Sequence, residues 1–78
     1  MTITSLDLLG KGEHCLVLKV SNDNVELQSR LYALGVIPGA LVKILRLAPL
    51  GDPMQVKVGG SFISIRRAEA AIIQVDTQ

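Results

Sequence analysis

Short segments of regularly spaced apolar residues run along this chain, separated by glycine, proline and asparagine. Residues 15–20 are apolar on both faces, which is typical of a central strand. Residues 54–58 alternate between apolar and polar, which predicts a half-buried strand. Gly-Gly at 59–60 predicts a two-residue hairpin turn into a strand at 61–65, and residues 72–75 predict the last strand.

The strand predicted at residues 40–47 contains an irregularity. Lys43 and Arg46 have opposite parity, so a regular strand would point one of them into the core. A β-bulge near Leu45 would turn both to solvent and bend the strand, as a small barrel requires. The proline- and glycine-rich residues 49–53 then predict a loop.

One helix is predicted between the first two of these strands. Asp23 and Glu26 have the spacing of a capping box, which predicts the helix start. Gly35 suits the left-handed position just after a helix end, and Pro38-Gly39 then suits a type II turn. The apolar stripe expected to face the core consists of Leu27, Leu31 and Leu34.

Together these elements predict a mainly β fold of one domain over residues 1–78. Five short strands with closely spaced turns favour a small closed barrel over a sandwich of two sheets. The helix is inserted between strands 1 and 2 of that count. Short helical turns are expected at residues 5–9 and, before the last strand, at 67–70.

Composition limits the possible functions. The net charge is only +1, and the chain has one Phe, one Tyr and no Trp. We therefore expect no nucleic-acid binding and no aromatic groove for proline-rich peptides. No apolar stretch is long enough to span a bilayer, and the N-terminus lacks the basic start of a secretion signal, so a cytoplasmic location is expected.

The residues give little support for catalysis. His14 and Cys15 are adjacent, so on a strand they point to opposite faces and cannot easily share a metal or form a nucleophile pair. Cys15 is expected to be a buried small apolar residue and His14 to be exposed. The glycines do not match a phosphate-binding loop. We expect no catalytic, cofactor-binding or metal-binding residues.

The outer side of the predicted helix carries Val25, Gln28 and Tyr32, opposite the core stripe. This apolar pair around a glutamine is either a contact site for a partner or a second buried side of the helix, and the sequence leaves both open. Arg66 and Arg67 are either a contact for an acidic surface or a solvated strand end.

Several short motifs carry a family resemblance. They are Arg30-Leu31, Leu34-Gly35, Pro38-Gly39, Leu45-Arg46, the string APLGDP at 48–53, Ile65-Arg66-Arg67 and Glu69-Ala70. In these motifs the chain resembles the ferrous-iron transport protein A (FeoA) family, from about residue 30 to residue 75. The resemblance implies an SH3-like barrel, in agreement with the architecture derived from the strands.

The resemblance also implies a function. FeoA proteins are cytosolic accessories of FeoB, a bacterial membrane transporter with a GTPase domain that moves Fe(II) inward, so this chain would be peripheral to the inner membrane through its partner. The alternative is a free-standing relative of the SH3-like domain that ends certain iron-dependent repressors, acting as an adaptor on a regulator. The sequence leaves self-association open.

We hypothesise which surface of this chain contacts the transporter. It consists of the outer helix face with Val25, Gln28 and Tyr32, together with the loop residues Leu50 and Asp52. Arg66 and Arg67 form the alternative surface.

Overall fold

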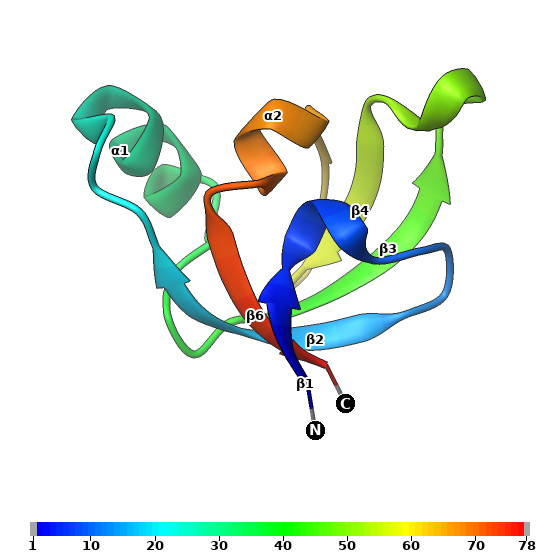
Figure 1. The fold of residues 1–78 in the computed structure, drawn as a ribbon, viewed down its shortest axis with the longest axis horizontal. Helices are drawn as coiled ribbons and strands as arrows, with labels where there is room; N and C mark the ends of the chain where they lie inside the picture. The colour runs from blue at the N-terminus through cyan, green and yellow to red at the C-terminus, as the bar shows by residue number, and fades with distance from the viewer. Residues whose placement is uncertain (1, 78) are drawn as a thin grey trace.

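The structure is a computed structural model that describes residues 2–77 (Figure 1). In chain order its elements are β1 (Thr2–Ser5), the 3-10 turn η1 (Leu6–Leu8), β2 (His14–Val20), α1 (Val25–Ala33), β3 (Leu41–Leu47), η2 (Pro49–Gly51), β4 (Met54–Val58), β5 (Ser61–Ile65), α2 (Arg67–Ala70) and β6 (Ile73–Thr77).

All six strands belong to one antiparallel sheet in the order β1-β6-β2-β3-β4-β5. The sheet curves around a single core, with α1, α2 and η1 on its inner side (Figure 1). The mainly β expectation is confirmed, and β2 is central as predicted. Within residues 2–77, no ladder joins β1 to β5, so the hydrogen-bonded sheet remains open at that seam.

The predicted strand count was wrong by one, because β1 went unrecognised. Its four residues are too few to show a convincing alternation, and the strand exists by pairing with β6 at the far end of the chain. Thr2 pairs with Thr77 and Ser5 with Gln74. With β1 counted, the inserted helix lies between β2 and β3 rather than between strands 1 and 2.

The bulge predicted near Leu45 is confirmed. The register of β3 against β4 shifts between Ile44 and Arg46, and both Lys43 and Arg46 are exposed. The extra residue lets the two basic side chains face solvent while Ile44 stays in the core. A second register shift, in β2 between Val17 and Lys19, has no signal in the residue pattern.

The start of α1 lies one residue later than predicted. Asn24, not Asp23, is the N-cap, and its Oδ1 accepts a hydrogen bond of 3.1 Å from the N–H of Leu27. Asn24 can take the N-cap position in place of Asp23 because an amide oxygen caps a helix as effectively as a carboxylate.

The end of α1 is as predicted. The Val36 N–H donates to the Leu31 carbonyl at 2.9 Å and the Gly35 N–H to the Tyr32 carbonyl at 3.0 Å, which is the Schellman pattern. Gly35 has a φ of 95°. The core stripe is only partly correct: Leu31 is buried and Leu27 half-buried, but Leu34 is exposed. Leu34 is the C-cap, and its side chain lines an open groove beside Leu31 instead of entering the core.

The core fills the concave side of the sheet. Leu6 from η1, Leu31 from α1 and Ala70 from α2 close it on the side opposite the strands. The inward residues of the sheet are the alternating apolar ones, including Val42 and Ile44 of β3. Each helix therefore has one side fixed against the core and another side free to carry surface features.

Candidate interaction surface

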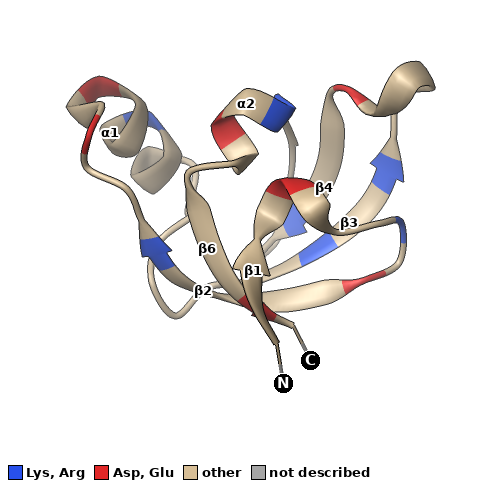
Figure 2. Cartoon of the chain, in the orientation of Figure 1, with Lys and Arg blue, Asp and Glu red and all other residues tan. Residues whose placement is uncertain are grey.

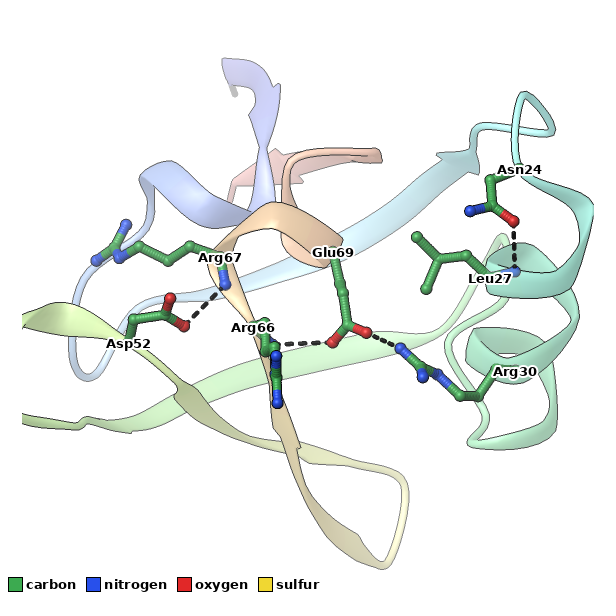
Figure 3. Close-up of polar contacts among 7 residues, drawn as sticks. All are labelled: Asn24, Leu27, Arg30, Asp52, Arg66, Arg67 and Glu69. Carbon is green, nitrogen blue, oxygen red and sulfur yellow. Dashed lines mark hydrogen bonds and ion pairs between the residues drawn. The ribbon is translucent and has the colours of Figure 1, made fainter.

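Three segments lie in a row on the helical side of the sheet: α1, α2 and loop 48–53, which contains η2 (Figure 1). We call this row the helical rim. α2 is in the middle, because Glu69 reaches an arginine of α1 while Arg67 reaches loop 48–53 (Figure 3). The residues predicted to contact a partner all lie on this rim.

Arg67 holds loop 48–53 in place. Its backbone N–H donates to Asp52 Oδ1 at 3.1 Å, and its Nε donates to the Gly51 carbonyl at 2.6 Å. The guanidinium also donates to the Asp7 carbonyl in η1. One half-buried side chain thus joins the loop, η1 and the start of α2. Asp52 and Arg67 are therefore hydrogen-bonded to each other within the chain, which gives both a structural role.

Leu50 is the most exposed residue of this loop. Its side chain is fully exposed, at 104%, and its backbone is left-handed with φ 68° and ψ 9°. A residue with a Cβ pays about 1–2 kcal/mol for that conformation. The loop is closed beneath it by the Gly51 N–H on the Ala48 carbonyl at 2.7 Å and the Ala48 N–H on the Pro53 carbonyl at 3.1 Å. The surrounding bonds therefore hold an apolar side chain out in solvent.

Glu69 connects α2 to α1. Its Oε1 accepts a hydrogen bond of 3.0 Å from the Arg66 N–H, and its Oε2 is ion-paired with Arg30 (Figure 3). The side chain of Arg66 is exposed. Below this junction is an open groove of about 460 Å³, lined by Arg30, Leu31, Leu34, Pro53, Ser64, Ile65, Arg66 and Glu69.

The outer side of α1 is exposed, so Val25 and Tyr32 do not form a second buried side of the helix. Val25 is 63% exposed and Tyr32 40%. Gln28 differs from them, because it is half-buried and its Nε2 donates to the Val20 carbonyl at the end of β2, at 3.1 Å. Gln28 therefore fixes α1 against the sheet, while Val25 and Tyr32 form the free surface.

The predicted contact residues fall into two groups. Leu50, Asp52 and Arg67 are together at loop 48–53, and Val25 and Tyr32 are on α1, with α2 and Arg66 in between (Figures 1 and 3). The structure does not bring loop 48–53 next to the exposed pair of α1. A partner that contacts both groups must span the rim across α2.

Titratable groups give the surface no evident chemistry. Cys15 is fully buried, and this burial raises the pKa of its thiol to about 11, with a further contribution from the Glu13 carboxylate. The thiol is therefore protonated at neutral pH. His14 is exposed. Residues 2–77 contain no group of three or more His, Cys, Asp or Glu side chains placed to hold a metal ion.

Sequence reasoning missed the contacts that shape the rim. Arg30 and Glu69 are 39 positions apart in the printed numbering, and Arg67 reaches 60 positions back to Asp7. No local pattern signals such pairs. The strongest available signal was the proline and glycine around Leu50 in 48–53, which predicts a loop but not its left-handed residue.

The described part of the chain contains no helix long and apolar enough to cross a membrane. Its features are those of a small β domain with an open, structured rim. The FeoA domain family model matches residues 4–77, and the chain belongs to that family.

A curated relative joins such a domain to a transporter. The chain is 28% identical over 71 residues to the Fe(2+) transport protein A/Fe(2+) transporter FeoB fusion protein of Porphyromonas gingivalis. The match covers 91% of this chain and 8% of the fusion protein, so the chain corresponds to a small part of that relative.

Solved structures of FeoA proteins have the same fold. The FeoA protein of Chlorobium tepidum is 38% identical with a TM-score of 0.84, and the match covers 95% of this chain and 70% of that one. The zinc complex of FeoA from Stenotrophomonas maltophilia, described as an SH3 domain protein, is 29% identical with a TM-score of 0.82, covering 94% and 89%. The SH3-like expectation is confirmed.

The same fold occurs in a manganese-dependent transcriptional repressor. Its TM-score is 0.90 at 14% identity, over all of this chain and 38% of the repressor chain. At this identity the likeness shows the fold alone.

Proposed function

We propose that this protein is a non-enzymatic accessory of ferrous iron uptake that binds the cytosolic portion of a FeoB transporter through its helical rim. The observation that carries the proposal is the relative in which a domain like this one and FeoB form one polypeptide. Covalent linkage keeps two modules at high effective concentration, which is useful when they act together. A domain that is not fused to the transporter needs instead a surface that binds the transporter without a covalent link.

Loop 48–53 has the features of such a surface. Leu50 is fully exposed, and the bonds to Arg67 hold it in a strained backbone conformation. Strained residues of this kind concentrate at binding sites. A loop whose backbone is already fixed loses little conformational entropy on binding, so the side chain that it presents is suited to be an anchor. We assign Leu50 this role and Arg67 the role of a positioning residue.

The α1 pair supplies a second contact in the proposal. Tyr32 offers a large apolar ring with a polar tip, and Val25 is exposed beside it on the same helix. The whole molecule is 28 Å in its longest dimension, so a partner footprint of about 800 Å² per side can cover the rim from α1 to loop 48–53. Arg66 lies within this footprint, and Asp52 and Gln28 support it from below.

A binding experiment tests the proposal. The purified chain is titrated against the cytosolic portion of FeoB, in the absence of lipid. Replacing Leu50 by glycine removes the anchor and suits the left-handed backbone, so we expect binding to weaken about tenfold or more with no loss of fold. The matched control is Phe62→Ser, which removes another exposed apolar side chain, on the opposite side of the sheet.

Two results would contradict the proposal. One is that the wild-type chain does not bind the cytosolic portion at all. The other is that Leu50→Gly binds as well as wild type while Phe62→Ser loses binding, which would place the interface on the sheet. The adaptor alternative has no specific support, because the likeness to the repressor is limited to the fold.

A further inference from the structure

The face of the sheet that points away from the core carries a basic row with apolar neighbours. His14 of β2 is paired with Lys43 of β3, Lys43 with Lys57 of β4, and Lys57 with Phe62 of β5. All four residues are exposed. Because directly paired residues of neighbouring strands project on the same side, they form one continuous line across the sheet.

Two more residues extend this line. Leu41 is two positions before Lys43 on β3, hence on the same face, and is 66% exposed. Arg46 lies beyond the bulge and is also exposed. We call the set His14, Leu41, Lys43, Arg46, Lys57 and Phe62 the basic sheet face. Figure 2 shows basic positions along β3 and acidic positions on α1 and α2, among others.

No acidic side chain neutralises this face within residues 2–77. The ion pair found there joins Arg30 of α1 to Glu69 of α2, and neither residue is on a strand of this face. Glu13 precedes His14, but its carboxylate accepts a hydrogen bond from the Gly10 N–H at 2.7 Å and so is directed to the preceding loop. Asp76 of β6 shares the outward side of the sheet but is buried, at 5% exposure. Within residues 2–77, none of the basic side chains of this face is therefore ion-paired.

The apolar members distinguish between anionic partners. Phe62 is 72% exposed and lies with its ring 6.0 Å from the Lys57 ammonium. A phenylalanine and a leucine among cationic side chains match the boundary between anionic headgroups and acyl chains, where both kinds of side chain are favourable. Nucleic acid is a poorer match, because one aromatic ring gives no platform for successive bases and the net charge is only +1.

From this geometry we infer that the basic sheet face binds the surface of an anionic lipid bilayer. The contact is peripheral: Lys43, Arg46 and Lys57 reach phosphate-containing headgroups, while Leu41 and Phe62 enter the interface. The helical rim is on the other side of the sheet and stays accessible to a protein. The inference is independent of the transporter assignment, since it concerns lipid alone.

Co-sedimentation of the full chain with vesicles tests it. Vesicles of phosphatidylcholine are compared with vesicles that also contain phosphatidylglycerol. We expect binding to the anionic vesicles only, reversed by salt at about 0.5 M because screening shortens the range of the charges. Replacing both Lys43 and Lys57 by glutamine is expected to lower the partition coefficient about tenfold or more, since each lysine near such a surface contributes substantially. Phe62→Ser is expected to lower it further.

The matched control is Arg30→Gln with Arg66→Gln, which removes the same charge from exposed sites on the helical side of the sheet and should leave vesicle binding within about twofold of wild type. Equal loss in the control would overturn the inference, because binding would then follow net charge. Equal binding to phosphatidylcholine alone would also overturn it. A third contradicting result is that a single-stranded oligonucleotide releases the chain from anionic vesicles because it binds Lys43 and Lys57 more tightly than the vesicles do. Because no transporter is present, these results are separate from those on FeoB.

Discussion

Gly35 shows how a single residue ends α1. Its φ of 95° is a conformation that residues with a Cβ resist, and a Cβ built there would meet only Val58 Cγ1 at 3.6 Å, an ordinary contact. The requirement for glycine is therefore a property of the backbone and not of crowding.

Replacing Gly35 by valine should lower the free energy of unfolding by at least ~1 kcal/mol, because a β-branched residue is strained at positive φ. Asparagine tolerates this region better, so Gly35→Asn should be milder. Chemical denaturation of the three proteins measures the difference. Equal stability of the valine variant and the wild type would contradict this account of the helix end.

Cys15 gives a second prediction at the residue scale. Its pKa is raised from 9.0 to about 11 in the folded chain, so the unfolded state loses the thiol proton first as the pH rises. The folded state then binds more protons, and stability falls between about pH 9 and pH 11. Below pH 9 the full contribution is present.

We therefore expect a larger alkaline loss of stability in the wild type than in Cys15→Ala, which has no thiol to ionise. Denaturation curves at several pH values in this window measure the difference. Parallel curves for the two proteins would show that ionisation of Cys15 does not contribute, since all other groups are common to both.

At the scale of elements, Arg67 joins parts of the chain that are far apart in sequence. Through its guanidinium and its backbone N–H, it connects α2 to loop 48–53 and to η1. Neighbouring Arg66 has an exposed side chain, and its described hydrogen bonds are made by its backbone: the N–H donates to Glu69 Oε1, and the carbonyl accepts from the Glu69 and Ala70 N–H groups. The two adjacent arginines thus differ in structural role, which provides a matched pair.

Arg67→Gln should lower the free energy of unfolding by about 1–3 kcal/mol, because it leaves the Gly51 and Asp7 carbonyls without their donor. Arg66→Gln should change it by about 0.5 kcal/mol or less. Thermal denaturation compares them. If the two variants were equally stable, the arrangement of loop 48–53 around Arg67 would be incorrect.

Leu50 allows backbone strain to be separated from contact. Leu50→Gly and Leu50→Ala both remove the side chain, but only glycine is at ease at a φ of 68°. We expect the glycine variant to be more stable than the alanine variant by about 0.5–1 kcal/mol, while both bind the FeoB portion weakly. Alanine matching glycine in stability would show that position 50 is not strained in solution.

On the scale of the whole molecule, the curved sheet separates two surfaces. The helical rim presents Leu50, Tyr32 and Val25, and the basic sheet face presents Lys43 and Lys57 on the other side. A protein partner and an anionic surface can therefore be engaged at once. This arrangement depends on the order of the strands and on α1 being fixed to β2 by Gln28.

The extent of the rim interface can be tested on α1. The double variant Val25→Ser with Tyr32→Ser should weaken binding to the FeoB portion about tenfold and leave the melting temperature nearly unchanged, because both side chains are exposed. When the double variant is combined with Leu50→Gly, the losses of binding free energy should add, since the two sites share no contacts. Normal binding by a folded α1 variant would restrict the interface to loop 48–53.

The sequence by itself determined the features that follow local rules. The strand alternation, the bulge near Leu45, the Pro38-Gly39 turn and the Schellman end at Gly35 could be predicted because each depends on residues within one or two turns of chain. The exposure of His14 and the burial of Cys15 followed from the same alternation. The family resemblance rests in part on the same local features, since Leu34-Gly35, Pro38-Gly39 and the string at 48–53 are a helix end and turns of this fold.

Only the tertiary structure decided the rest. β1 exists through pairing with β6, and the left-handed Leu50 is held by bonds from Arg67, 16 residues beyond Gly51. The sequence alone did not show that Gln28 fixes α1 to the sheet. It also did not show that the predicted contact residues form two groups on either side of α2. Such features depend on contacts between segments that are far apart in the sequence, and local propensity does not specify these contacts.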